Sequence, residues 1–191
     1  MASTARTDSL DLIFSDVAAW NSLRTPNDSG STNLVDADLA GANLAGANLA
    51  GADLTGADLS GADLTDASLE GANLTSVELV GADLARADLS GVIAHDANLT
   101  GAYLTRACLR DADLTLAYLT STFLGYADLA GADLSGAYMT GAYLGDADLT
   151  GAILISAYLG KANLTGANIV KAVLDGADLT NATMPDGTSV D

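Results

Sequence analysis

The stretch Ala52-Asp53-Leu54-Thr55-Gly56-Ala57-Asp58-Leu59-Ser60-Gly61 contains two copies of a five-residue unit, which recurs from Asn33 to Met184 without insertion or deletion. Counted by its central residue, the unit occurs 31 times, and leucine is central in 27 copies. The four exceptions are Ala94, Met139, Ile169 and Met184. A short fixed period is typical of arrays in which each unit packs only on its neighbours, so the 191-residue chain is expected to form one solenoid.

The order of residues within the unit predicts which side chains are buried. In an extended segment, side chains alternate between sides, so the central Leu and the Ala two residues earlier face the same way. The Asp or Asn between them faces outward. Winding such short strands into coils buries the leucines along one axis and pairs each strand with the coils above and below. An interior of Leu and Ala leaves no room for a buried active site.

The corners between strands are expected to depend on glycine. The residue two after Leu is often Gly, as in Gly41, Gly46 and Gly56, and glycine suits the φ > 0 position of a type II turn. A different turn is expected where another residue stands there, as at Asp66, Ser76, Arg86, Asp96 and Lys161.

One unit, Gly91-Val92-Ile93-Ala94-His95, exchanges a larger and a smaller residue at its two inward positions. Either the two changes compensate in volume, which cores tolerate best, or the solenoid kinks at this coil. His95 is expected to point outward into solvent.

Composition excludes several classes of function. The net charge is −18, whereas proteins that bind nucleic acid directly need a basic face, so any recruited partner is expected to be basic or a second copy. No apolar run approaches the roughly 18 residues of a membrane span. Met1 to Leu10 is a poor secretory signal, and a single cysteine, Cys108, excludes an internal disulfide framework. The expected location is the cytoplasm, without membrane attachment.

The in-register units resemble the pentapeptide-repeat proteins, especially the regular stand-alone bacterial members, among which cyanobacterial ones are prominent. The resemblance covers about four-fifths of the chain. It implies an all-β solenoid: a right-handed quadrilateral parallel β-helix with four pentapeptides per coil. Residues 31–185 would then form roughly eight coils, in a rod roughly 37 Å long.

The two ends are predicted to differ. Apolar residues at helical spacing predict a capping helix over residues 8–25, with Ser9 as N-cap. These apolar residues are Leu10, Ile13, Phe14, Val17, Trp20 and Leu23. Ala19-Trp20-Asn21-Ser22-Leu23-Arg24 resembles a leader found before the repeats in the family, with Leu23 in place of a second aromatic. Residues 1–7 are expected to be disordered, residues 26–32 to form a loop, and residues 186–191 to fray beyond the repeats at 33–185.

With four units per coil, residues twenty apart stack in columns on the outside. Six aromatic residues then fall into two columns on neighbouring faces: Tyr103, Phe123 and Tyr143, and Tyr118, Tyr138 and Tyr158. Stacked rings can simply stabilise the surface, by about 0.2–1 kcal/mol per pair. Alternatively, the contiguous rings bind a partner or a second copy of the chain. In a corner column, Asp66 is expected to pair with Arg86, and Arg106 to lie over Tyr126.

Carboxylates form further columns: Asp38, Asp58 and Glu78 on one face, and Asp63 and Asp83 on the next. On flat exposed faces nothing excludes water, and the sequence shows no Ser-His-Asp set, phosphate loop or Cys/His metal spacing. Neither an enzyme nor a cofactor or metal site is therefore expected. The carboxylates either maintain the repeat and its solubility or imitate DNA.

Two functions follow as hypotheses. The first is a non-enzymatic acidic rod that acts as a structural or protein-interaction module with an unknown target. The second rests on the resemblance, because some pentapeptide-repeat proteins modulate or protect type II topoisomerases such as DNA gyrase by imitating DNA. Residues 31–185 carry 19 acidic and five basic residues. This is roughly one net charge per 2.6 Å of rod, against ~1.7 Å for duplex DNA.

Overall fold

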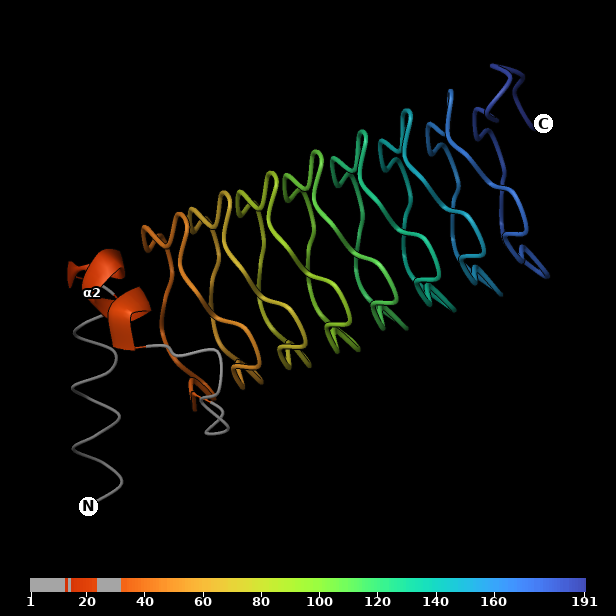
Figure 1. Cartoon of the computed structure of the whole chain (residues 1–191). Helices are drawn as coiled ribbons and strands as arrows, with labels where there is room; N and C mark the ends of the chain where they lie inside the picture. Colours follow the sequence, from red (N-terminus) through yellow and green to blue (C-terminus); the bar gives the residue numbers. More distant parts are fainter. Residues whose placement is uncertain (1–12, 14, 24–31) are drawn as a thin grey trace.

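The computed structural model describes residues 13, 15–23 and 32–191, and it forms a rod of stacked coils with helix α2 (Val17–Leu23) at one end (Figure 1). Every parallel bridge joins residues twenty positions apart, from Asn33↔Asp53 to Asn163↔Thr183. One coil therefore takes four five-residue units. Each of these bridges is a single residue pair, not part of a longer strand, because a turn follows directly after the central Leu.

The bridges run in four columns, which define four faces of the rod. Face 1 starts at Asn33, face 2 at Asp38, face 3 at Asn43 and face 4 at Asn48, and each face continues with every twentieth residue. Faces 2 and 3 follow one another along the chain within each coil. Residues of one face thus come from distant parts of the sequence.

Backbone hydrogen bonds hold each unit to both neighbouring coils. The Leu and the corner residue donate to the following coil, and the bridging residue donates to the preceding one. The N–H of the next Ala closes the turn. In the unit that begins at Ala52, these bonds are Leu54 N–H to Asn73 O (2.8 Å), Gly56 N–H to Thr75 O (3.0 Å), Asp53 N–H to Thr32 O (2.8 Å) and Ala57 N–H to Leu54 O (3.0 Å).

The corners share one backbone conformation whatever their side chain. Every corner residue from Asp36 to Asn181 has positive φ, and 15 of these residues are not glycine. Arg86 has φ of 61°, against 66° at Gly41. The prediction of a different turn at non-glycine corners is therefore wrong, because the ladder bonds on both sides dictate the corner. A corner residue other than Gly, Asp or Asn carries a steric cost of about 1–2 kcal/mol.

The interior consists of the Leu and Ala columns, whose residues are almost completely buried as far as Ala167. Val92 and Ala94 are both buried, and the ladder continues through Ile93, which bridges to Asn73 and Asp113. The exchange of sizes is thus accommodated within the core. Thr122 replaces Ala in the interior, and its hydroxyl donates to Leu99 O at 2.7 Å.

Helix α2 covers the first coil, which has no preceding coil to bond to. Side chains of the helix make hydrogen bonds that a preceding coil makes elsewhere in the rod. Trp20 Nε1 donates to Asn48 O at 2.9 Å, and Asn48 N–H donates to Asn21 Oδ1 at 2.7 Å. Both backbone groups of this bridging residue are therefore satisfied. Trp20 and Ile13 are buried, and Val17 packs against the same core.

Within the predicted capping helix, the described residues Ile13, Ser15 and Val17–Leu23 are helical, and helix α2 begins after a break at Asp16. Its N-cap is Asp16, whose carboxylate accepts the Ala19 N–H at 2.9 Å. Leu23, predicted on the buried side, is 67% exposed. Ser9, Leu10 and Phe14 lie outside the described residues.

The C-terminal tail is paired, in contrast to the frayed end expected for residues 186–191. Ser189 forms an antiparallel bridge with Thr183, and Val190 exchanges hydrogen bonds with Asn181 and Ala182. The tail thus folds back along one side of the last coil. In the part of the chain that the structure describes, no helix is long and apolar enough to cross a bilayer.

Candidate interaction surface

The outward Asp and Asn residues have a local structural role. Each one at a bridging position, from Asn33 to Asp178, accepts through Oδ1 the N–H two residues later, at 2.9–3.3 Å. This N–H is the one that the backbone ladder leaves unpaired. The Asx turn thus explains physically why the repeat prefers these two residues.

Neighbouring hydroxyl groups stabilise several of these carboxylates in the ionised form. The hydroxyl and the N–H of Thr150 both bond to Asp148 and hold its pKa below the usual range. Ser60 lowers the pKa of Asp58 in the same way, and Thr180 that of Asp178. These hydrogen bonds favour the charged form, so the three carboxylates keep their negative charge to lower pH than an ordinary Asp does.

The aromatic residues lie on faces 2 and 3, as the twenty-residue spacing predicted. On face 2, Tyr118 and Tyr138 stack with ring centroids 5.0 Å apart, and Tyr138 stacks on Tyr158 at 5.0 Å. On face 3, Tyr103 stacks on Phe123 at 4.9 Å. All six aromatic side chains on these faces, Tyr143 included, are between 36% and 48% exposed. We call them the aromatic patch.

Tyr143 departs from the stack on its face. A Cβ added to Gly125 would lie 2.9 Å from the Tyr143 ring, and one added to Gly145 would meet the ring and its hydroxyl. The Tyr143 ring therefore lies over these two buried glycines instead of on Phe123. Glycine directly after Leu124 and Leu144, where Thr, Ser or Ala is usual, was the sequence signal for this arrangement.

The predicted acidic columns occupy the other end of the same two faces. Asp38, Asp58 and Glu78 are exposed on face 2, whereas Asp63 and Asp83 are half-buried on face 3. Among the described residues, none of the five forms an ion pair. Glu78 accepts a hydrogen bond from Asn98 Nδ2 at 2.7 Å, which joins the acidic column to the residue next to the tyrosines.

Charge divides faces 2 and 3 into two halves. The segments that form the first half, residues 37–45, 57–65 and 77–85, carry all five acidic residues and no basic residue. The segments of the second half, residues 97–105, 117–125, 137–145 and 157–165, carry no acidic residue, and their one charge is Lys161. Beyond them, face 2 ends at Asp178, which bridges to Tyr158. A largely uncharged aromatic patch thus adjoins an acidic surface on a strongly acidic chain.

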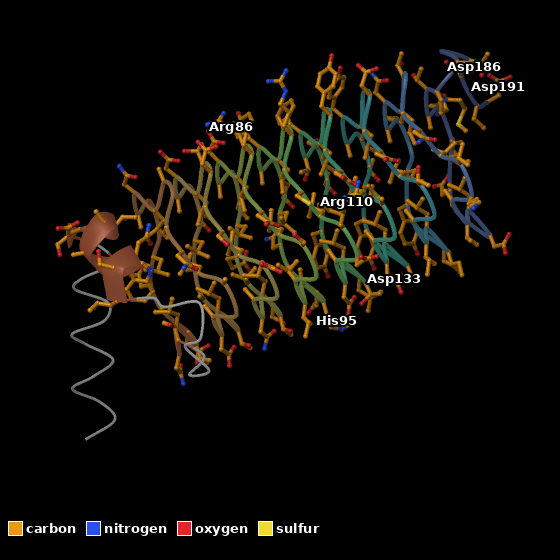
Figure 2. The ribbon with its side chains drawn as sticks, in the orientation of Figure 1. Arg86, His95, Arg110, Asp133, Asp186 and Asp191 are labelled. Carbon is orange, nitrogen blue, oxygen red and sulfur yellow. The ribbon has the colours of Figure 1, made fainter. Side chains whose placement is uncertain are left out.

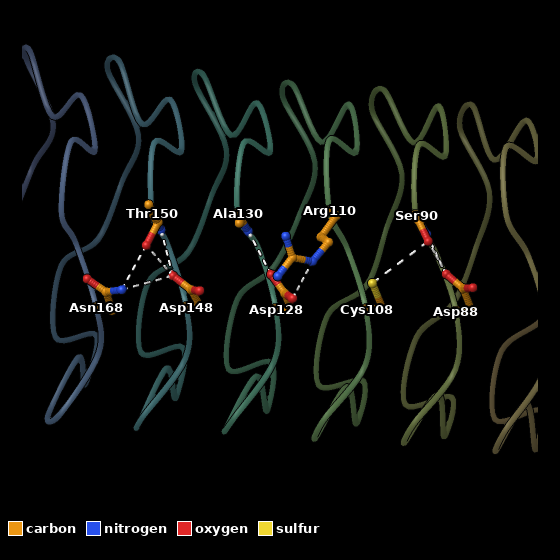
Figure 3. Close-up of polar contacts among 9 residues, drawn as sticks. All are labelled: Asp88, Ser90, Cys108, Arg110, Asp128, Ala130, Asp148, Thr150 and Asn168. Atoms are coloured by element: carbon orange, nitrogen blue, oxygen red, sulfur yellow. Dashed lines mark hydrogen bonds and ion pairs between the residues drawn. The ribbon is translucent and has the colours of Figure 1, made fainter.

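Face 4 compensates part of its own charge. On face 4, Arg110 Nε lies 2.5 Å from Asp128, and Asn168 Nδ2 donates to Asp148 and Thr150 in the preceding coil (Figure 3). Cys108 lies 3.8 Å from Ser90 Oγ on the same face.

The corner column also forms its predicted contacts. Arg86, which projects from the rod in Figure 2, makes two bonds to Asp66 at 2.6 and 2.7 Å. Arg106 lies over the Tyr126 ring, with its guanidinium carbon 5.7 Å from the centroid. Asp146 accepts a hydrogen bond from Tyr126 and raises its pKa.

Groups suited to catalysis are sparse on these surfaces. His95 is exposed, and its Nδ1 lies 2.8 Å from Thr115 Oγ1 in the next coil (Figure 2 labels His95). Within residues 13, 15–23 and 32–191, no three His, Cys, Asp or Glu side chains are grouped closely enough to hold a metal ion. The described faces present ladders of like residues, which suit binding over an extended surface.

Comparison with solved structures places this architecture among known ones. HetL, a pentapeptide repeat protein involved in heterocyst differentiation regulation from the cyanobacterium Nostoc sp. strain PCC 7120, is 33% identical over 83% of each chain, with a TM-score of 0.50. Rfr23 from the cyanobacterium Cyanothece 51142 is 40% identical over 45% of this chain and 58% of its own, with a TM-score of 0.45. A trypsin-treated form of QnrB1, a plasmid-mediated fluoroquinolone resistance protein, is 18% identical over 81% and 74%, with a TM-score of 0.47.

Among curated proteins no relative was found. The family model for pentapeptide repeats matches residues 32–71, 53–91, 67–106, 82–120, 97–136, 117–154 and 157–185, which together span most of the chain. The chain therefore belongs to the pentapeptide-repeat family.

Proposed function

We propose that the chain is a non-enzymatic interaction module, an acidic rod whose aromatic patch binds a protein. The proposed scaffold is a right-handed quadrilateral β-helix of roughly eight coils, stiffened by a backbone ladder in every unit. One observation carries the proposal: six exposed rings lie together on segments with no acidic residue, although the chain has a net charge of −18. Exposed apolar patches rich in Tyr and Phe are typical of protein-binding sites. HetL, involved in heterocyst differentiation regulation, is a relative whose role an interaction module could fill.

Site-specific photo-crosslinking tests this function. A photo-reactive phenylalanine analogue at Tyr138 is expected to capture a protein in cells of the source organism. The same analogue at Asp128, on face 4, serves as the control and is expected to capture none. Equal capture at both positions, or none at Tyr138, would contradict the proposal. Light scattering of the purified protein then shows whether the captured protein is a second copy.

The DNA-mimicking function is the second candidate, favoured by the five carboxylates on faces 2 and 3 that have no ion-pair partner among the described residues. It predicts that the purified protein inhibits DNA gyrase supercoiling, or protects the enzyme from a quinolone. Replacing Asp38, Asp58, Asp63 and Asp83 by Asn should remove the effect. Asn can still accept the Asx-turn hydrogen bond, so loss of inhibition would report charge rather than folding. No effect of the parent protein on gyrase would end this candidate.

A further inference from the structure

We propose that faces 2 and 3 form one continuous docking strip for a basic, amphipathic protein helix, whose apolar end covers the aromatic patch and whose Lys- or Arg-rich end lies over the acidic columns. The inference rests on the proposed function and specifies its partner. Along face 2 the strip runs from Asp38 through Asp58, Glu78 and Asn98 to the tyrosines. Asp38 and Tyr158 are separated by six steps of the ladder, or roughly 29 Å at the usual strand spacing.

The stacking geometry selects a protein partner over a sugar or a nucleobase. The interplanar angles are 3°, 9° and 1°, so rings within a stack cover one another's faces. The outer surface therefore presents ring edges and, on face 2, a row of phenol groups. Sugars and bases bind aromatic side chains through open ring faces. Ring edges and hydroxyls instead suit the packing of apolar side chains with a few hydrogen bonds.

Besides the faces at the ends of the stacks, the face of Phe123 toward Tyr143 is not covered by another of the described rings. Tyr103 covers one side of Phe123, but Tyr143 lies over Gly125 and Gly145, so no ring of the described chain stacks on the other side. An aromatic or leucine side chain of the partner can pack at this position. Such a partly enclosed apolar contact near the centre of an interface is typical of an energetic hot spot.

The backbone of the strip argues for a helix rather than an added strand. The bridging residues of faces 2 and 3 already use their N–H and C=O groups in the coil ladder, as Tyr118 does with Ala97 and Leu99. A partner strand would need free backbone donors and acceptors along an edge. Docking on these faces must therefore use side chains, and a helix of about 19 residues spans roughly 29 Å.

The charges of the strip make a second copy a poor occupant. In a parallel pair, the two acidic halves would face one another. In an antiparallel pair, each acidic half would lie on the other chain's aromatic patch and lose water without gaining a cation. A partner with Lys or Arg at one end supplies the missing counter-charge, and it would also be attracted from a distance by the net charge of −18.

Two designed peptides test the inference on the intact protein. Both are fluorescent 20-residue helices of identical composition. One has Leu, Ala and Trp in one half and Lys in the other; its counterpart has the Lys residues spread along its length. In fluorescence anisotropy titrations, the segregated peptide is expected to bind about tenfold more tightly, because only it matches both halves of the strip.

Protein variants then locate the binding. The triple variant Asp38→Asn, Asp58→Asn and Glu78→Gln should bind the segregated peptide about tenfold more weakly than the parent. Its affinity for this peptide should also depend less on the salt concentration. The matched control, Asp53→Asn, Asp113→Asn and Asp133→Asn on face 1, removes the same charge and should change affinity less than about twofold. Equal losses in both variants, or equal affinity for the two peptides, would overturn the inference.

Failure of the inference can be separated from failure of the proposed function. Replacing Tyr118, Tyr138 and Tyr158 by Ser should strongly weaken binding of the segregated peptide. If the two peptides bind equally and the Ser variant weakens both, the aromatic patch remains an interaction surface and only the partner assignment fails. If the Ser variant binds as the parent does, both the inference and the use of this patch are wrong.

Discussion

The two halves of faces 2 and 3 share one backbone but have opposite surfaces. In the half that begins at Asp38, bridging Asp residues accept the N–H two residues later. In the half that ends at Tyr158, the rings cannot make this bond and stack on one another instead. The ladder and the buried Leu and Ala columns continue unchanged through both halves. The outward residue is therefore largely uncoupled from the fold, so its identity is free to serve binding.

The largest expected effect tests whether the core is indeed the same in both halves. Leu64 and Leu124 are buried in the same interior column, one behind each surface. Each change to Ala should destabilise the protein by about 2–5 kcal/mol, because it leaves a cavity in a tightly packed column. Thermal unfolding followed by circular dichroism measures both. A large loss in one variant and a small one in the other would show that the halves are not equivalent.

The next largest loss of stability is expected in the aromatic half alone. Gly145→Ala would place a methyl group against the Tyr143 ring and should cost about 1–3 kcal/mol. Gly160 holds the same position in its unit, and an added Cβ there would meet the Thr180 carbonyl at 3.7 Å and Asp178 Oδ2 at 3.9 Å, both ordinary contacts, so Gly160→Ala is the matched control. Adding Tyr143→Ser to Gly145→Ala should restore most of the lost stability. If it does not, the ring is not the reason for the glycine.

Relieving or adding strain at a corner is expected to change the stability by an intermediate amount. Leu116 is 45% exposed and has φ of 59°, a conformation in which its Cβ is crowded. Leu116→Gly should stabilise the aromatic half by about 1 kcal/mol, because it relieves this crowding. In the acidic half, Gly41→Ala should have the opposite sign, since Gly41 has φ of 66° and nothing lies near an added Cβ. Chemical denaturation resolves both signs, and stabilisation by Gly41→Ala would refute the explanation.

Converting one half into the other should barely change stability. Tyr118→Asn, Tyr138→Asn and Tyr158→Asn lose two ring pairs, worth about 0.2–1 kcal/mol each, and gain three Asx turns of similar value. The melting temperature should therefore stay close to that of the parent, whereas binding through the aromatic patch should be lost. Unfolding of this variant would show that the rings support the fold after all.

The smallest effect concerns pH. Asp58, Asp148 and Asp178 have lowered pKa values because neighbouring Ser and Thr groups donate hydrogen bonds to the charged form. A carboxyl with a lowered folded pKa adds stability above its unfolded pKa of ~3.9 and loses it as pH falls through the folded value. The parent should thus lose more stability between pH 6 and pH 2.5 than a variant with Asn at all three positions. If the parent and the variant lose the same stability between these two pH values, this explanation is wrong.

Much of the fold could be predicted because the period repeats the same choices many times. The inward Leu and Ala and the outward Asp follow from side-chain alternation. The columns twenty residues apart needed four units per coil, which the resemblance to the pentapeptide-repeat proteins supplied. The corners were mispredicted because glycine at most early corners pointed to residue preference, whereas ladder bonds impose positive φ even on Leu116 and Tyr126. The paired tail at Ser189 depends on which part of the last coil the chain end meets, which local pattern does not encode.

The positions of the surface residues could be predicted, but the conformations of their side chains could not. Spacing placed the six rings on two faces, and the charges of both halves can be read from the sequence. The turned Tyr143 ring could not be inferred from spacing, because it depends on space above Gly125 and Gly145 in two different coils.

The period, the buried Leu and Ala columns, the acidic charge and the order of surface residues can all be read from the sequence, because each depends on residues within a single unit or on a simple count. The corner conformation, the covering of both ends and the orientation of the rings come from the tertiary structure. These features arise where neighbouring coils meet, and there the partner of a group is set by stacking rather than by proximity in the chain.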